Sequence, residues 1–270
     1  LHLGEVERRP YVKLLTFCQN SEEKLGVLSE CQNKIYSFEE LGLDYGNMEE
    51  FIAKSTAEDL EKLRCASSLC SDVIDINSVQ VIAPIPRPSQ DVIIMEDNYF
   101  KDEKEASLFK SQQLSKEEPL LPIYYYKKAT LANYDGGEIP SYPSHVGMLD
   151  YQVELAVIIK KDIKNVSEQD AAKYIFGYTI INNIIARDLV KKHRRPYIAT
   201  SLDGFLPMGP WIVTADEFTD KKLFNISSSV NGEIRQNATT QLLKFSPEYA
   251  VSDLSRAGVL KAGSIITTGT

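Results

Sequence analysis

Short apolar stretches separated by turn signals run along most of the chain. The most continuous one is Val153–Ile159, and an apolar run without polar alternation predicts a strand buried on both faces. Asn231–Gly232 lies between two further stretches and predicts a hairpin with a tight turn. Further strands are predicted over residues 178–185, 210–214, 226–230, 233–237 and 264–268. We therefore expect this part of the chain to be mainly β.

The first eighty residues have a different pattern, in which short strands precede two helices. Asn47 and Thr56 are suited to cap these helices, and Asp59 follows Thr56 by three positions as an acidic partner. The strands are predicted over residues 11–17, 24–28 and 34–38. A strand at residues 79–82 and the proline-rich stretch 84–88 then mark a boundary. We expect a small N-terminal domain over residues 1–80 and a larger domain over residues 81–270.

Two further helices interrupt the strands of the larger domain. Ser167 and Asp170 predict a helix start, and Gly177 is expected to end that helix in the left-handed conformation. Ser246, followed by a proline, predicts a second helix that Gly258 closes. Many strands with few helices indicate an α+β fold, mainly β, with a rolled β architecture rather than a doubly wound sheet.

Composition and charge narrow the classes of function. The 270 residues are 43% apolar and 25% charged, which is ordinary for a globular protein with a core. No apolar run reaches about 18 residues, so we expect no membrane-spanning helix. A net charge of −8 argues against nucleic acid as the main partner. The cysteines match no zinc spacing and are expected to stay reduced in a cytoplasmic protein. They are Cys18, Cys31, Cys65 and Cys70.

Several smaller features leave alternatives open. The chain begins without Met and stops abruptly at Thr270, so we expect that it is trimmed and lacks a C-terminal tail. Residues 111–118 are polar and charged, which predicts a solvated connector or a lid. The basic run 191–195 either lies on a solvated face or attracts an anionic substrate. His145 is either a surface side chain or a ligand or base.

One predicted strand carries polar residues on a single face. Asp150, Gln152 and Glu154 alternate along it, so their side chains share one side of the sheet. The strand then becomes apolar, and a buried carboxylate there needs a partner or a metal ion. The other interpretation is a solvent-exposed strand start.

Five sequence motifs in the same order resemble the fumarylacetoacetate hydrolase family. They are LDYQVELAVII at 149–159, FGYTI with NNIIARDL at 176–189, DGFLPMGPWIVT at 203–214, VNGEIRQ at 230–236 and TTGT at 267–270. The match spans about residues 82–270. It implies the family's β-roll of mixed sheets, and residues 1–80 resemble the small domain that many members carry.

The resemblance also implies a chemistry. Members of the family act on 2-oxo acids and 1,3-diketo acids by C–C hydrolysis, decarboxylation, hydration or tautomerisation. These reactions share an enolate held on a divalent metal, usually Mg²⁺ or Mn²⁺, which carboxylates bind. The family commonly forms dimers. We therefore expect a small oxo-acid ligand, a homodimer, and Mg²⁺ or Mn²⁺ as in the family, or no metal.

The metal positions of the family are altered in this chain. Glu154 is retained, whereas Gln152 and Asn183 stand where the family has carboxylates. Three carboxylates would present a charge of −3, and this set presents −1. Losing a unit charge about 4 Å from a cation costs on the order of 1–4 kcal/mol even with strong screening. We expect a degenerate site at which a metal is weak or vacant, unless Asp102 or Asp150 compensates.

The catalytic positions are only partly retained. The family's His aligns with Asp102 and its Lys with Thr200, whereas Arg187, Asp203 and Lys127 are kept. The resemblance then gives Arg187, Glu154, Asp203 and Lys127 as candidate catalytic residues. Its candidate substrate-binding residues are Arg187, Lys127, Thr200, Gly204 and Thr270.

Two functions follow from these changes and both stay open. The first is a hydrolase-, lyase- or tautomerase-like enzyme with altered or metal-independent chemistry on a small oxo acid. The second is a catalytically inactive paralogue that acts as a ligand-binding or scaffolding subunit.

Overall fold

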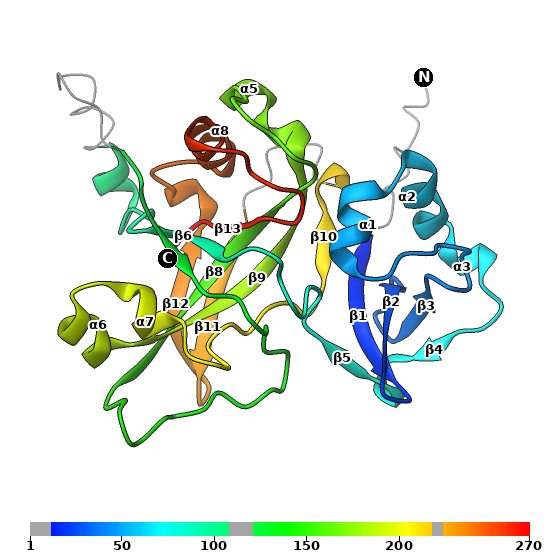
Figure 1. Ribbon diagram of the computed structural model, residues 1–270, viewed down its shortest axis with the longest axis horizontal. Helices are drawn as coiled ribbons and strands as arrows, with labels where there is room; N and C mark the ends of the chain where they lie inside the picture. The colour runs from blue at the N-terminus through cyan, green and yellow to red at the C-terminus, as the bar shows by residue number, and fades with distance from the viewer. Residues whose placement is uncertain (1–11, 108–120, 218–223) are drawn as a thin grey trace, which may run out of the picture.

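The computed structural model describes residues 12–107, 121–217 and 224–270 (Figure 1). The predicted connector or lid at 111–118 lies outside these residues. The N-terminal part combines an antiparallel sheet with short helices. Its strands are β1 (Lys13–Gln19), β2 (Glu22–Leu28), β3 (Lys34–Ser37) and β4 (Ile74–Asp75), and its helices are α1 (Met48–Lys54), α2 (Ala57–Arg64) and α3 (Ala66–Leu69). Asn47 caps α1, and Thr56 with Asp59 forms a capping box on α2, which confirms both predicted helix starts.

One mixed sheet continues from this part into the rest of the chain. Its strand order is β4-β3-β2-β1-β10-β9-β8-β13-β6-β7, and β5 pairs with β1. The added strands are β5 (Gln80–Ile82), β6 (Val92–Glu96), β7 (Ile123–Lys127), β8 (Leu149–Ile159), β9 (Ile175–Ala186), β10 (Ile212–Thr214) and β13 (Ile265–Thr267). Figure 1 shows β13 between β6 and β8. The structure confirms an α+β fold that is mainly sheet.

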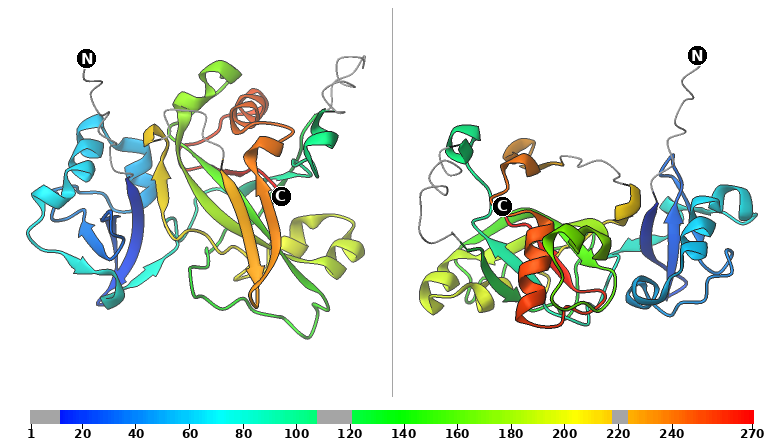
Figure 2. Two further views of the ribbon diagram at one scale, coloured as in Figure 1. Left: turned by 180° about the vertical axis from the view of Figure 1, so that it is seen from behind. Right: turned by 90° about the horizontal axis from the view of Figure 1, so that it is seen from above.

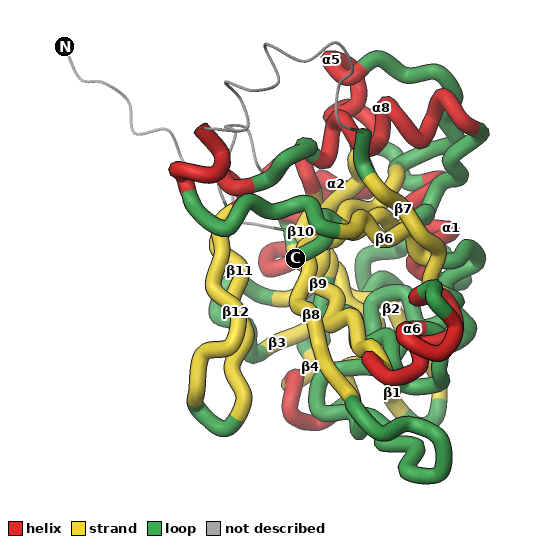
Figure 3. The backbone as a smooth tube through the Cα atoms, turned by 90° about the vertical axis from the view of Figure 1, so that its left-hand side faces the viewer, coloured by secondary structure: helices red, strands yellow, loops and turns green. Residues whose placement is uncertain are grey.

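The predicted hairpin forms a separate two-stranded sheet. It joins β11 (Asn225–Val230) to β12 (Glu233–Thr239). Asn231 and Gly232 have φ of 53° and 82°, the positive values that a tight hairpin turn requires. Figures 2 and 3 show this hairpin beside β8 and close to the end of the chain.

Helices cover the outside of the larger part. They are α5 (Glu168–Ala171), α6 (Arg187–His193), α7 (Pro196–Thr200) and α8 (Pro247–Ala257). The prediction that Gly177 ends α5 is wrong. A 3-10 turn carries the chain from Ala172 to Tyr174, and Gly177 lies inside β9. A Cβ at Gly177 would collide with the backbone oxygen of Val213, so the glycine is needed for close pairing with β10.

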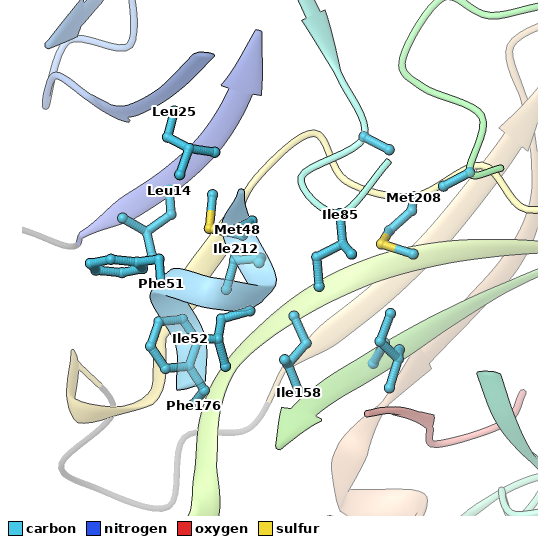
Figure 4. Packing of buried hydrophobic residues seen from close by; sticks show 14 of the residues in the cluster. Leu14, Leu25, Met48, Phe51, Ile52, Ile85, Ile158, Phe176, Met208 and Ile212 are labelled. Atoms are coloured by element: carbon cyan, nitrogen blue, oxygen red, sulfur yellow. The ribbon is translucent and has the colours of Figure 1, made fainter. Parts of the chain in front are cut away.

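The largest core cluster joins the two parts of the chain (Figure 4). Phe51 and Ile52 of α1 pack beside Phe176 of β9 and Ile212 of β10. The rings of Phe51 and Phe176 meet edge to face, with centroids 6.0 Å apart. Within the described ranges, no helix has the length and apolar character to cross a bilayer.

Candidate active site

The polar face predicted on the long strand lies where β8 pairs with β9. Gln152 stands directly opposite Asn183 in the register, and Glu154 follows two positions later on the same face. Lys127, the last residue of β7, reaches Asn183 from a third strand. Glu154 and Lys127 are each 1% exposed and Asn183 is 0% exposed. The fold therefore buries one acid, one amide and one amine together.

Hydrogen bonds link these side chains in a row. Lys127 Nζ donates to Asn183 Oδ1 over 2.8 Å and to the backbone oxygen of Ile184 over 3.1 Å. Asn183 Nδ2 donates to Glu154 Oε1 over 2.8 Å and to the Tyr125 hydroxyl over 3.0 Å. The Thr267 hydroxyl donates to Glu154 Oε2. The lysine at one end sets the orientation of the amide, and the amide then holds the carboxylate.

Burial governs the protonation of this row. It raises the pKa of the Glu154 carboxyl, while hydrogen bonds from Thr267 and Asn183 and the charge of Lys127 act in the opposite direction. Burial lowers the pKa of the Lys127 ammonium, and the charge of Glu154 opposes that change. Burial and the nearby Glu154 charge also raise the pKa of the Tyr125 phenol, so this group keeps its proton. A carboxyl with a raised pKa is a better proton acceptor than an exposed one.

The donor set does not fit a divalent cation. Both oxygens of Glu154 already accept hydrogen bonds, and Asn183 Oδ1 accepts from an ammonium group. A dication at this place would stand beside the buried positive charge of Lys127. Three carboxylates together with the lysine at position 127 would sum to −2, which a dication balances, whereas Glu154 and Lys127 alone sum to zero. Among the residues that the structure describes, no three His, Cys, Asp or Glu side chains cluster as metal ligands.

Arg187 stands at the more open end of the same face. It begins α6 directly after β9, and its Nε donates to Asp150 Oδ2 over 2.7 Å. The two side chains are 41% and 38% exposed, so a ligand can reach the guanidinium. Asp150 binds only Nε, and no other described residue hydrogen-bonds this guanidinium. The outer nitrogens are thus available to a carboxylate in two-point geometry.

The predicted residues Thr200, Asp203 and Gly204, at the end of α7 and just after it, do not join the row. Thr200 is buried, and its hydroxyl donates to the backbone oxygens of Pro196 and Tyr197 in its own helix. Asp203 is exposed, and its backbone oxygen accepts a hydrogen bond from Tyr142. Gly204 has φ of 80° beside Pro140, which is a structural reason for glycine there.

Asp102 and the other open candidates lie at the surface. Asp102 is exposed and accepts a hydrogen bond from the Glu105 backbone over 2.8 Å, so it caps a helical turn. His145 is exposed and contacts Ser144. The basic run 191–195 falls at the end of α6, where Lys192 pairs with Asp188. None of these side chains contacts Glu154 or Lys127.

Sequence reasoning missed several groups that surround Glu154. The Gly269 backbone amide also donates to Glu154, and the Tyr99 hydroxyl pairs with Thr268 nearby. Gly269 and the predicted substrate-binding residue Thr270 line a cavity of about 200 Å³. Its other walls are Tyr99, Val153, Ile226, Gln236, Asn237 and Ala238. The TTGT motif at 267–270 was the only sequence signal for these residues, and it does not show that they contact Glu154.

Two larger hollows of about 460 and 540 Å³ lie in the N-terminal part. Neither one contains a residue of the row around Glu154. By volume alone, these hollows would be the candidate ligand sites. The buried polar groups around Glu154 instead favour the smaller cavity lined by Gly269 and Thr270.

Comparison with known proteins gives consistent matches along the chain. The family described as Fumarylacetoacetate (FAA) hydrolase C-terminal matches residues 91–270. The chain is 32% identical to Oxaloacetate tautomerase YisK of Bacillus subtilis (strain 168) over 278 residues, which covers 99% of this chain and 87% of that protein.

Solved structures agree with these matches. A fumarylacetoacetate hydrolase from psychrophilic Exiguobacterium antarcticum aligns with a TM-score of 0.80 and 28% identity, covering 96% of this chain and 86% of that chain. Maleylpyruvate hydrolase from Sphingobium sp. SYK-6, in complex with manganese(II) ion and pyruvate, aligns with a TM-score of 0.72. It is 24% identical, covers 96% and 88% of the two chains, and supports the fold alone.

Proposed function

Because the chain belongs to the fumarylacetoacetate hydrolase family, we propose that it is an enzyme that interconverts the keto and enol forms of a small 2-oxo acid. We further propose that it does so without a resident divalent cation. The observation that carries this proposal is the buried row of Lys127, Asn183 and Glu154 beside an accessible Arg187.

The hydrogen bonds of the row leave capacity for a substrate. An ammonium has three donors, and Lys127 uses two of them. A carboxylate has about four acceptor positions. Glu154 uses three of them, for Asn183, Thr267 and the Gly269 amide. One donor and one acceptor position therefore remain, and they belong to neighbouring groups of opposite charge.

These free positions match the needs of keto–enol exchange. Arg187 binds the substrate carboxylate, and Glu154 accepts a proton from the carbon next to the carbonyl. The electron pair of that C–H bond forms the C=C bond, while the carbonyl electrons move to oxygen. The remaining N–H of Lys127 stabilises the charge that develops on this oxygen, and the oxygen takes up the proton that Glu154 removed from carbon, so that the exchange is a net isomerisation. The protein needs no activated water for this exchange.

The altered positions favour tautomerisation over hydrolysis. Asp102 and Thr200 replace the family's histidine and lysine, which the resemblance connects with activation of water or of the leaving carbon. Tautomerisation uses neither group. The name of the Bacillus subtilis relative, which is similar over almost the whole chain, is in agreement.

The test is the decay of the enol form of a 2-oxo acid, followed by ultraviolet absorbance with protein pre-treated with a chelator. We expect acceleration above the buffer rate, loss of it in Glu154→Gln, and no dependence on added Mn²⁺. Lys261→Met removes a charge from an exposed ion pair with Asp162 and serves as a matched control that keeps the rate. No acceleration with or without metal would refute the enzymatic proposal.

The inactive alternative has one observation in its favour. All three donors to Glu154 belong to the protein itself, so the row is also a complete structural network. A non-catalytic subunit would bind an oxo acid through Arg187 without changing the enol decay rate. Calorimetry with oxalate, combined with the absorbance assay, separates the two functions.

We also propose that the chain forms a homodimer in a reducing compartment such as the cytoplasm. β7 is an edge strand of the large sheet, and Tyr126 on it is 59% exposed. Tyr197 and Ile198 of the adjacent α7 are 45% and 46% exposed, so apolar surface gathers at this edge. Light scattering should give twice the chain mass of 30.4 kDa.

The proposal of a reducing compartment is supported by the four cysteines, which are free thiols.

A further inference from the structure

A β-bulge lies in the hairpin wall of the cavity beside Glu154. The register runs Val230 to Glu233 and Ser229 to Ile234, and then Ser228 to Gln236. Arg235 therefore has no partner across the hairpin. Such an extra residue reverses which side chains of one strand point to a given face.

Because of the bulge, Gln236 and not Arg235 lies in the cavity wall. Directly opposed residues of an antiparallel pair share one face, so Gln236 lies on the face of Ser228 and Ile226. Without the bulge, Ser228 would oppose Arg235, and the arginine would occupy that face. In the structure Arg235 is exposed and pairs with Glu233 over 2.6 Å, whereas Gln236 lines the cavity.

Gln236 is fixed in this position by its own hydrogen bonds. Its Oε1 accepts from the backbone amide of Val153 over 2.9 Å and from the Ser228 hydroxyl over 3.0 Å. Its Nε2 donates to the Thr270 hydroxyl. The side chain thus links β12 of the hairpin to Val153 of β8 and to Thr270. Figure 3 shows that the hairpin backbone lies close to β8 and to the end of the chain.

The cavity offers neutral groups to whatever enters it. Its polar side chains are the hydroxyls of Tyr99 and Thr270 and the amides of Gln236 and Asn237, and the remaining walls are apolar or glycine. None of the described residues that line it is charged. A carboxylate placed there would lose water without gaining a cation, so its binding is disfavoured relative to that of an uncharged group.

The cavity also adjoins the group that is expected to move the proton. Gly269 lines the cavity and donates its amide hydrogen to Glu154. We propose that this cavity is the subsite for a substituent on the carbon that Glu154 deprotonates, and that the bulge-positioned Gln236 selects an uncharged substituent over a second carboxylate. This inference rests on the proposed keto–enol function and names its substrate class as 2-oxo monocarboxylates.

A matched pair of ligands tests the subsite. Oxaloacetate and 2,4-dioxopentanoate have nearly the same shape, but the first carries a distal carboxylate where the second carries a neutral acetyl group. Their dissociation constants are measured by calorimetry and their enol decay rates by absorbance. We expect at least tenfold tighter binding of 2,4-dioxopentanoate. Equal binding, or tighter binding of oxaloacetate, would overturn the inference.

Two variants and a control extend the test to Gln236 itself. Q236R should shift the ratio of the dissociation constants at least tenfold toward oxaloacetate, because it returns a cation to the cavity wall. Q236E keeps an acceptor for the Val153 amide and should shift the ratio the other way. R235Q changes the charge on the outer face and should leave the ratio unchanged. Ratios that do not respond to either Gln236 variant would overturn the inference.

Binding and turnover separate this inference from the proposed function. Preferential binding of 2,4-dioxopentanoate without any acceleration supports the neutral subsite and refutes keto–enol catalysis. Acceleration of both ligands with a preference for oxaloacetate supports catalysis and refutes the neutral subsite.

Discussion

Replacing the carboxamides of Gln152 and Asn183 with carboxylates should convert the buried row around Glu154 into a site for a divalent cation. The perturbation is Gln152→Glu together with Asn183→Asp. Lys127 and Glu154 now carry +1 and −1, so the exchange brings the sum to −2. Asn183 is fully buried and lies 2.8 Å from both Lys127 Nζ and Glu154 Oε1. The new carboxylate at this position therefore cannot turn toward solvent.

The magnitude follows from the charges around position 183. Two unit charges about 4 Å apart interact by about 4 kcal/mol at an effective dielectric constant near 20. Repulsion from Glu154 and attraction to Lys127 act over similar distances and largely cancel. Desolvation of the added charge then dominates and costs several kcal/mol per ion. Without metal, we expect the double variant to be several kcal/mol less stable than the wild-type chain.

Manganese should return part of this stability. At a concentration of 100 times the dissociation constant, a ligand that binds only the folded state adds about 2.7 kcal/mol. For a chain of this size, that corresponds to a rise in Tm of about 5–10 °C. The wild-type protein should show no comparable shift, because the charges of Lys127 and Glu154 already sum to zero.

The assay is thermal unfolding of both proteins in chelator and in millimolar Mn²⁺. Asn77→Asp with Gln80→Glu adds the same two charges at exposed positions and serves as the matched control. A double variant whose Tm ignores Mn²⁺ would refute the charge argument. A wild-type Tm that rises by the same amount with Mn²⁺ would refute it equally.

Three further predictions concern other residues. Asp150→Asn should raise KM several-fold with little change in kcat, because Asp150 orients Arg187 through the 2.7 Å contact to Nε; steady-state kinetics on a 2-oxo acid measure this. Gly177→Ala should cost about 1–3 kcal/mol in urea unfolding, since its Cβ would meet the Val213 backbone oxygen. Asp59→Asn should lower stability by about 0.5–1 kcal/mol at pH 7 and by nothing measurable at pH 2. Hydrogen bonds from Thr56 lower the pKa of the folded Asp59 carboxyl below its ordinary 3.8, so its contribution is present above that value and is lost as the pH falls through the folded pKa; denaturant titrations at both pH values compare the two proteins.

Local patterns predicted most of the strands and helix starts. The continuous apolar run at 153–159 forms the buried end of β8, and the Asn231–Gly232 turn lies where the pattern placed it. Each of these signals depends on residues within a few positions of one another. Gly177 shows the limit, because the reason for that glycine is the backbone of β10, more than thirty residues later.

The site was predicted less completely because its groups come from different strands. Periodicity placed Gln152 and Glu154 on one face, and the structure has them there. No local signal shows that Lys127 donates to Asn183 or that Thr267 donates to Glu154, since these pairs are 56 and 113 residues apart. Thr200 and Asp203 came from motif alignment alone, which carries no information on where a replaced side chain turns. Their roles at the site stay a prediction.

The most direct test of the account is deuterium exchange at the carbon next to the carbonyl of 2,4-dioxopentanoate in D₂O, followed by proton NMR in the presence of a chelator. The account predicts that the wild-type protein accelerates the exchange, that Glu154→Gln abolishes the acceleration, and that added Mn²⁺ changes neither result. Exchange that the wild-type protein accelerates only with Mn²⁺, or does not accelerate at all, would contradict a metal-independent keto–enol site.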